Sequence, residues 1–141
     1  MKRIATAHWN GNLKEGKGEI STQSTVLNQT QYSFNTRFAD GVGTNPEELI
    51  AAGHAGCFTM AVSAFLTQSG FSAGDLDTKA TIELDPAAQK ITGIALELTA
   101  SVIEGLNEEQ FVAVAEQAKQ NCPISKLLTG APITLKVVYG K

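Results

Sequence analysis

Hydrophobic and polar positions along the chain follow two periods, one of two residues and one typical of helices. Apolar side chains alternate with polar ones in Thr78–Leu84, in Ile94–Val102 and again in Ile133–Tyr139. This spacing indicates half-buried strands, and the turn residues "DPAA" between the first two segments predict a hairpin. The "WNGN" and "EGKGE" turns predict short strands in the amino-terminal region.

The longest apolar run, Leu49–Leu66, is bounded by helix start and stop signals. In "TNPEEL", Asn45 suits the N-cap, Pro46 the first helical position and Glu48 the position from which a capping box closes. Gly70 in "QSGF" supplies the stop. A helix that is apolar on all sides is expected to lie buried at the centre of a soluble protein.

A second helix is predicted from "NEEQF", where Asn107 is the N-cap and Gln110 completes a capping box. Its apolar stripe consists of Phe111, Val114, Ala115 and Ala118. Strands in runs, interrupted by helices, predict an α+β fold instead of strict βαβ alternation. The length of 141 residues suits a single domain, 1–141.

Charge and targeting signals exclude several classes of partner. The net charge is −3 and the cationic residues are scattered, so we expect no nucleic-acid or membrane partner. The run Leu49–Leu66 approaches the length of a membrane span, but His54, Thr59 and Ser63 interrupt it and no cationic flank follows. "MKRIATAHWNGN" lacks the apolar core of a secretory signal, so we expect a cytoplasmic protein.

The two cysteines are the first candidates for chemistry. Thiols stay reduced in the cytoplasm, so Cys57 and Cys122 are reactive groups, metal ligands or inert core residues. In "QNCPISKLLTG", Cys122 would be the N-cap of a short helix begun by Pro123, a position that favours the thiolate; an inert cap residue stays an open alternative. Neither cysteine belongs to a CxxC motif, so no metal is expected.

Three further polar residues are singled out by position. In "YSFNTRF", alternation predicts a strand that places Arg37 opposite the aromatic side chains. Arg37 is either a solvated surface residue or a fixed cation that stabilises a thiolate or a polar substrate. Glu47 has no structural role that the sequence reveals. His54, three residues before Cys57, is interpreted as a core histidine with a satisfied hydrogen bond, in preference to a proton acceptor.

The segments "HWNG", "VLNQTQYSFNTRF", "GTNPEELIAAGHAGCF" and "NCPISKLL", in this order, closely resemble the OsmC branch of the OsmC/Ohr hydroperoxide reductases. The resemblance covers nearly the whole chain. It implies an OsmC-like fold, with antiparallel sheets around a buried central helix, in an intertwined homodimer with active sites at the subunit interface. Gly56 stands where the family leads us to expect alanine, a departure that weakens the helix but removes no catalytic group.

The chemistry that the resemblance implies is a thiol peroxidase without metal or cofactor. Cys57 would attack the peroxide and become a sulfenic acid, which Cys122 would convert into a disulfide. Arg37 would stabilise the thiolate and the developing charge on oxygen, and Glu47 would orient Arg37. The substrates would be apolar alkyl or lipid hydroperoxides, and the reductant a dithiol such as a dihydrolipoyl protein.

Two points stay open in the sequence. Local features favour Cys122 as the easier thiolate, so the order of attack follows the resemblance alone. On one straight helix, Glu47 and Cys57 are separated by roughly 15 Å of rise and about 280° of rotation, so a shared site needs a reaching arginine or residues from two chains. The alternatives are a noncatalytic ligand-binding stress protein with inert cysteines and a metal-binding protein that uses Cys57, Cys122 and His54.

Overall fold

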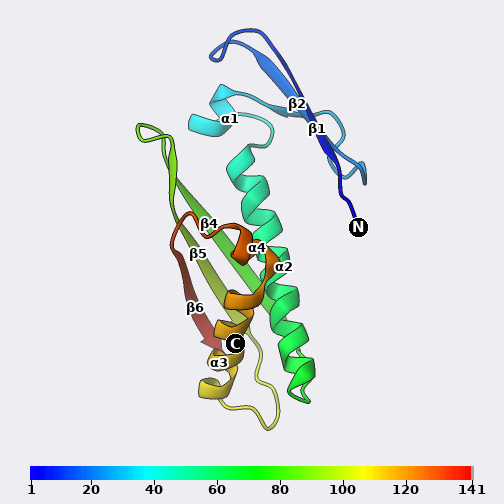
Figure 1. Cartoon of the computed structure of the whole chain (residues 1–141), viewed down its shortest axis with the longest axis vertical. Helices are drawn as coiled ribbons and strands as arrows, with labels where there is room; N and C mark the ends of the chain where they lie inside the picture. Colours follow the sequence, from blue (N-terminus) through cyan, green and yellow to red (C-terminus); the bar gives the residue numbers. More distant parts are fainter. Residues whose placement is uncertain (141) are drawn as a thin grey trace. The chain divides into compact units, whose positions relative to one another are not determined.

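The computed structural model describes residues 1–140 and shows a mixed α+β protein, as predicted. The chain forms two compact units, one from Met1 to Leu49 and one from Ile50 onward. Each unit contains one three-stranded sheet (Figure 1). The prediction of a single domain over 1–141 stays a prediction.

The first unit holds an antiparallel sheet with strands in the order β1–β2–β3. Gly18 of β2 leaves room for the rings of Trp9 and Tyr32, whose centroids lie 5.5 Å apart. A side chain at Gly18 would collide with both rings, so the sheet is closely packed at this point. The elements of this unit are β1 (Ala5–Asn10), β2 (Lys17–Thr22), β3 (Thr30–Tyr32) and α1 (Phe34–Phe38).

Helix α1 corrects the prediction of a strand in "YSFNTRF". Ser33 is the N-cap: its hydroxyl accepts from the backbone N–H of Thr36, while the Thr36 hydroxyl accepts from the backbone N–H of Ser33. The rings of Phe34 and Phe38 pack against each other one turn apart, tilted by 45° and with centroids 4.9 Å from each other. A short apolar alternation is compatible with a strand and with one helical turn. The Ser–x–x–Thr capping pair favours the helix here. Arg37 therefore lies in the last turn of a helix.

The second unit combines a β4–β5–β6 sheet with three helices (Figure 1). The predicted hairpin is the antiparallel pair β4–β5, whereas β6 runs parallel to β5 because two helices connect them. The prediction of antiparallel sheets is therefore wrong for the β5–β6 pair. The elements are α2 (Pro46–Gln68), which begins in the first unit, β4 (Leu76–Asp85), β5 (Lys90–Ala100), α3 (Glu108–Asn121), α4 (Pro123–Leu127) and β6 (Ile133–Tyr139).

The ends of the two long helices follow the predicted signals. The Asn45 side-chain oxygen accepts a 2.8 Å hydrogen bond from the backbone N–H of Glu48. The Glu48 carboxylate accepts in turn from the Asn45 side-chain amide at 3.4 Å, whereas in a capping box it would accept from the Asn45 backbone N–H. Gly70, at a φ of +86°, follows the end of α2. Asn107 and Gln110 form both halves of the capping box of α3. These local signals set where each helix begins and ends.

The core of the second unit lies between α2, α3 and β5. Residues of α2 spaced four apart form its buried face: His54, Phe58, Val62 and Leu66. The last three pack in one cluster with Leu96 and Leu98 of β5 and with the predicted stripe of α3. By length and composition α2 also meets the requirements of a membrane span, and 22% of the residues in its most apolar window are buried. The expectation of a helix buried on all sides is therefore met on one face only. Elsewhere along α2 exposed apolar surface remains, with Met60 75% exposed.

Candidate active site

The two cysteines, far apart in the sequence, meet in the second unit. Cys57 lies in the middle of α2, and Cys122 lies between α3 and α4. Their sulfur atoms are 2.9 Å apart and both thiols are free. A disulfide has an S–S distance of about 2.05 Å, so a movement of about 1 Å closes one. Cys122 is fully buried, whereas Cys57 is partly accessible and is the thiol that a solute can reach.

Cys122 lies at the junction between α3 and α4, where it is the C-cap of one helix and the N-cap of the other. Its backbone N–H donates to Ala118 at the end of α3, and its carbonyl accepts from Lys126 in α4. Pro123 occupies the first position of α4, so Cys122 is the N-cap, as predicted. Its thiol makes no N-cap hydrogen bond of the usual geometry, which leaves the sulfur free to face Cys57.

The electrostatic environment separates the two thiols. Burial raises the pKa of Cys57, and the contact with Cys122 raises it further, against a smaller effect of the Ile124 backbone N–H. Burial also acts to raise the pKa of Cys122, but the contact with Cys57 and the polar groups of Ser125 and Ile124 outweigh it and lower this pKa. Either sulfur can carry the shared proton, and these directions favour a Cys57 thiol that donates to a Cys122 thiolate. These directions agree with the local sequence argument for Cys122 as the easier thiolate, which stays a prediction.

His54 lies on α2, three residues before Cys57. Its ring is fully buried, and Nε2 lies 2.7 Å from the hydroxyl oxygen of Ser125, which is itself buried. The other ring nitrogen, Nδ1, is buried without a hydrogen-bond partner. Burial lowers the pKa of His54, so the ring is neutral at neutral pH. The interpretation of His54 as a satisfied core histidine holds for one ring nitrogen only.

Arg37 and Glu47 form a second polar pair, in the first unit. Both Nε and Nη2 of Arg37 donate to Oε1 of Glu47, at 3.0 and 2.8 Å. The Arg37 side chain is 42% exposed and that of Glu47 13% exposed. The second carboxylate oxygen, Oε2, is buried without a partner. Glu47 thus fixes the direction of the guanidinium, which is the contact that the family resemblance implies.

An aromatic pocket of about 250 Å³ adjoins this pair. Arg37 is the charged residue in its wall, and the guanidinium carbon also lies 5.2 Å from the centre of the Phe38 ring. Sequence reasoning did not find this pocket, although the aromatic residues on both sides of Ser33 were a signal for it. The lining residues are Trp9, Leu13, Tyr32, Ser33, Phe34, Arg37, Phe38 and Pro46.

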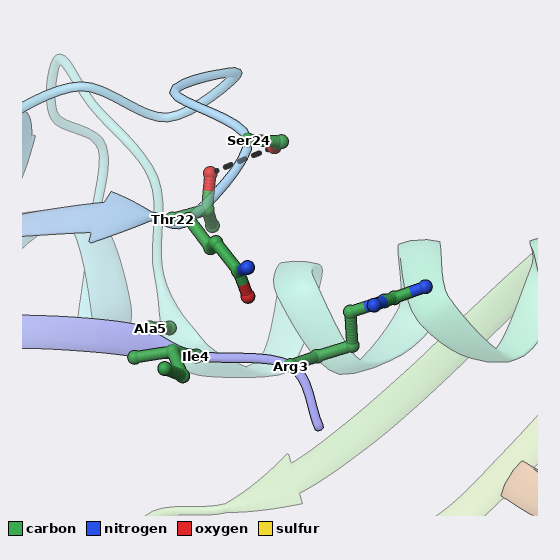
Figure 2. A pocket seen from close by; sticks show the side chains of 6 residues that line it. Arg3, Ile4, Ala5, Thr22 and Ser24 are labelled. Atoms are coloured by element: carbon green, nitrogen blue, oxygen red, sulfur yellow. Dashed lines mark hydrogen bonds between the residues drawn. The ribbon is translucent and has the colours of Figure 1, made fainter. Parts of the chain in front are cut away.

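A wider hollow of about 520 Å³ lies elsewhere in the first unit, between the start of β1 and the loop after β2 (Figure 2). The Thr22 and Ser24 hydroxyl oxygens lie 3.2 Å apart at its edge. Its lining contains no thiol, carboxylate or histidine, so it offers no group for peroxide chemistry. The residues that line it are Arg3, Ile4, Ala5, Thr22, Gln23 and Ser24.

Within residues 1–140, no three His, Cys, Asp or Glu side chains gather as metal ligands do. Cys57, Cys122 and His54 therefore form no ligand set among these residues. The structure brings the four predicted site residues together as two pairs, the cysteines in one unit and the ion pair in the other. Sequence reasoning missed Ser125, because nothing in "NCPISKLL" connects it with His54.

Comparisons with known proteins agree with this chemistry. A family model described as OsmC-like protein matches residues 39–138. The chain is 49% identical over 131 residues to Peroxiredoxin OsmC of Escherichia coli strain K12, covering 92% of this chain and 90% of that protein. It is 31% identical over 121 residues to Organic hydroperoxide resistance protein-like 1 of Staphylococcus epidermidis, covering 84% of each. A crystal structure of organic hydroperoxide resistance protein OsmC from Legionella pneumophila has a TM-score of 0.74 at 27% identity, covering 97% of this chain and 96% of that one.

Proposed function

Because the chain belongs to the OsmC-like family, in its OsmC branch, it is a cysteine-based peroxidase of organic hydroperoxides, and we propose that Cys57 and Cys122 carry out its cycle. The observation that carries the residue assignment is the pair of free sulfur atoms 2.9 Å apart, one accessible and one buried. A peroxide can reach the accessible sulfur first. The buried sulfur is already in place to form the disulfide.

The cycle has two chemical steps. The Cys57 thiolate attacks the terminal oxygen of the hydroperoxide: an S–O bond forms, the O–O bond breaks, and the alkoxide takes a proton and leaves as an alcohol. The Cys122 thiolate then attacks the sulfur of the Cys57 sulfenic acid, so an S–S bond forms and hydroxide leaves and is protonated to water. The two thiols lose two electrons and the peroxide gains two. An external dithiol reduces the disulfide and completes the cycle.

The first step needs a cation near Cys57. Burial and Cys122 both raise the pKa of the Cys57 thiol, so its local surroundings oppose the reactive thiolate. We assign this role to Arg37, whose guanidinium is held by two hydrogen bonds to Glu47. The same cation would stabilise the alkoxide that develops as the O–O bond breaks.

The aromatic pocket beside Arg37 supports a preference for apolar substrates. Its volume of about 250 Å³ suits the alkyl or aryl part of a small organic hydroperoxide. Hydrogen peroxide has no apolar part to bury there. We therefore assign the substrate tail to the aromatic pocket and the peroxide oxygens to Arg37.

A homodimer is the second part of the proposal. The face of α2 that is not buried in the core carries small and apolar residues, among them Gly56 with open space around it and the exposed Met60. A second copy of this helix would cover such a face, and a donor from a second chain would satisfy the buried Oε2 of Glu47. The Arg37 that serves Cys57 then comes from either chain of the dimer.

Sedimentation analysis tests the dimer. Met60→Glu places a charge on the proposed interface and should convert the protein to a monomer at micromolar concentration. Val26→Glu is the matched control, because Val26 is 83% exposed in the loop after β2. A monomeric wild type, or a Met60→Glu protein that remains dimeric, would refute this part of the proposal.

The thiol chemistry also supports a proposal for the reductant and for the compartment. In the disulfide, the Cys57 sulfur is the accessible one, because Cys122 is buried. The reductant therefore has to reach a partly buried sulfur atom. A dihydrolipoyl group on a flexible arm combines that reach with two thiols. Such reductants work in the cytoplasm, which is where we place this protein.

Free-thiol titration with intact mass analysis tests the cycle. One equivalent of cumene hydroperoxide should remove two thiols from the wild type and leave a sulfenic acid on Cys57 in the Cys122→Ser protein, whereas Cys57→Ser should not react. Reaction at Cys122 in the Cys57→Ser protein would reverse the order of attack. Two thiols that survive in folded protein would favour the alternative, a ligand-binding stress protein with inert cysteines.

A further inference from the structure

Trp9, Gly18 and Tyr32 stand side by side on the three strands of the first unit. Gly18 of β2 is the register partner of Trp9 in β1 and of Tyr32 in β3. Residues paired directly across neighbouring strands point to the same face of a sheet, so the two rings flank a position that carries no side chain. A Cβ at Gly18 would lie 2.7 Å from Trp9 Cε3 and would also collide with the Tyr32 ring. The glycine therefore lets both rings close over the strand between them.

The indole of Trp9 is also held against the backbone between β1 and β2. Its Nε1 donates a 3.0 Å hydrogen bond to the carbonyl of Gly11. A Cβ at Gly16 would lie 2.8 Å from Trp9 Cε2, so a second glycine lets the indole approach the backbone. A side chain that is fixed by packing and by a hydrogen bond holds one orientation, which is what a binding site requires of its walls. Trp9 therefore presents a fixed aromatic surface.

This surface is one wall of the aromatic pocket beside Arg37, and every residue of the pocket belongs to the first unit. Trp9 and Tyr32 form one tilted ring pair in the wall, at 56° with centroids 5.5 Å apart. Phe34 and Phe38 form a second, tilted by 45°. The faces and edges of aromatic rings attract a further aromatic ring beyond the effect of buried area, by about threefold to tenfold in affinity for one good contact. A saturated ring of the same size gains the buried area alone.

We propose that Trp9 is a specificity-determining residue, a fixed aromatic wall that makes aryl hydroperoxides better substrates than saturated hydroperoxides of the same size. The inference rests on the proposed function, which assigns the substrate tail to this pocket and the peroxide oxygens to Arg37. The volume of about 250 Å³ is smaller than a site for a drug-sized ligand, so it suits a tail with a single ring. Trp9 contacts the tail and takes no part in the transfer of electrons or protons.

Fluorescence tests the pocket without turnover, because Trp9 is the single tryptophan of the chain. The probe is the alcohol formed from cumene hydroperoxide, which has the same aryl tail and cannot oxidise a thiol. It should shift the emission of Trp9, and the analogue with a cyclohexane ring should need an about threefold to tenfold higher concentration. Phe34→Leu should weaken the aryl alcohol more than the cyclohexyl one. The control is His8→Leu, which changes the exposed neighbour on the opposite face of β1.

Steady-state kinetics test whether this preference reaches catalysis. In the wild type, kcat/KM for cumene hydroperoxide should exceed that for its cyclohexyl analogue by about threefold to tenfold. Trp9→Leu should remove most of this ratio, mainly through the KM for cumene hydroperoxide, whereas Trp9→Phe retains a ring and should keep it. Leu13→Ala is the matched comparison within the pocket: it removes an aliphatic side chain that is 65% exposed and should raise KM for both substrates by the same factor.

The outcomes separate this inference from the proposed function. Equal kcat/KM values for the two substrates, or equal losses for both in folded Trp9→Leu, would overturn the role of Trp9 and leave the cycle intact. Emission that the aryl alcohol does not change, or that both alcohols change at the same concentration, would overturn it as well. If Trp9→Leu does not fold, the titration of Phe34→Leu decides. A wild type that consumes neither hydroperoxide would refute the proposed cycle, and the substrate role of Trp9 with it, even where the aryl alcohol binds.

Discussion

Replacing Glu47 by glutamine tests whether this carboxylate acts through Arg37. Glutamine keeps an oxygen that accepts from Nε and Nη2 of Arg37 but removes the charge that holds the guanidinium in place. The ion pair is partly open to solvent on the Arg37 side, so its contribution to folding is close to that of a surface pair, about 1 kcal/mol or less. The variant should therefore fold normally.

The effect on catalysis should exceed the effect on stability. Removing a charged group that stabilises a developing oxyanion costs about a hundredfold or more in rate, which is the expectation for Arg37→Met. Glu47→Gln only loosens the cation, and we expect kcat/KM for cumene hydroperoxide to fall about tenfold, or about 1.4 kcal/mol. The assay follows hydroperoxide consumption with an excess of dithiol.

A double-mutant cycle supplies the decisive comparison. If Glu47 acts only by orienting Arg37, then Glu47→Gln has no further effect in an Arg37→Met background. The double variant should match Arg37→Met alone. A second tenfold loss in the double variant would refute the reasoning, because Glu47 would then act on the substrate or on Cys57 without Arg37.

Three further predictions concern stability. Burial lowers the pKa of His54 below its ordinary value of 6.5, so the unfolded chain binds this proton more readily than the folded one. The free energy of unfolding should therefore fall as the pH drops below 6.5. Urea titrations at about pH 7.5 and about pH 5 should show a smaller fall in His54→Gln than in the wild type. Phe111→Ala empties a fully buried site stacked on Tyr139 and should cost about 3 to 5 kcal/mol in the same assay, whereas a cost below 1 kcal/mol would contradict its place in the core. Gly70→Ala forces a side chain into the left-handed region at a φ of +86° and should cost about 1 kcal/mol, measured as a lower thermal midpoint; no change would show that the turn relaxes.

Local signals in the sequence predicted most elements, because caps and alternation act over a few residues. Asn45 and Asn107 mark the starts of α2 and α3, and Gly70 follows the end of α2. The same logic failed at Phe34–Phe38, where an alternating pattern is compatible with a strand and with one helical turn. There the capping pair of Ser33 and Thr36 outweighs the alternation.

The residues of the candidate site also fall into those that the sequence indicated and those that it did not. Family motifs in the sequence pointed to Cys57, Cys122, Arg37 and Glu47, and the structure forms a 2.9 Å sulfur contact and a 2.8 Å ion pair from them. Ser125 escaped notice because a serine in the first turn of a short helix, two residues after a proline, is an ordinary helix residue. Its hydrogen bond to His54 arises from the way α4 packs on α2.

The sequence by itself determined where most of the helices and strands lie and which residue types carry the chemistry, since those properties depend on neighbours within one or two turns. Only the tertiary structure decided that β6 runs parallel to β5, that one thiol is buried and the other accessible, and that a buried histidine is hydrogen-bonded to Ser125. Each of these depends on contacts between segments far apart in the chain. Such contacts follow from how the whole core packs, and no local pattern records them.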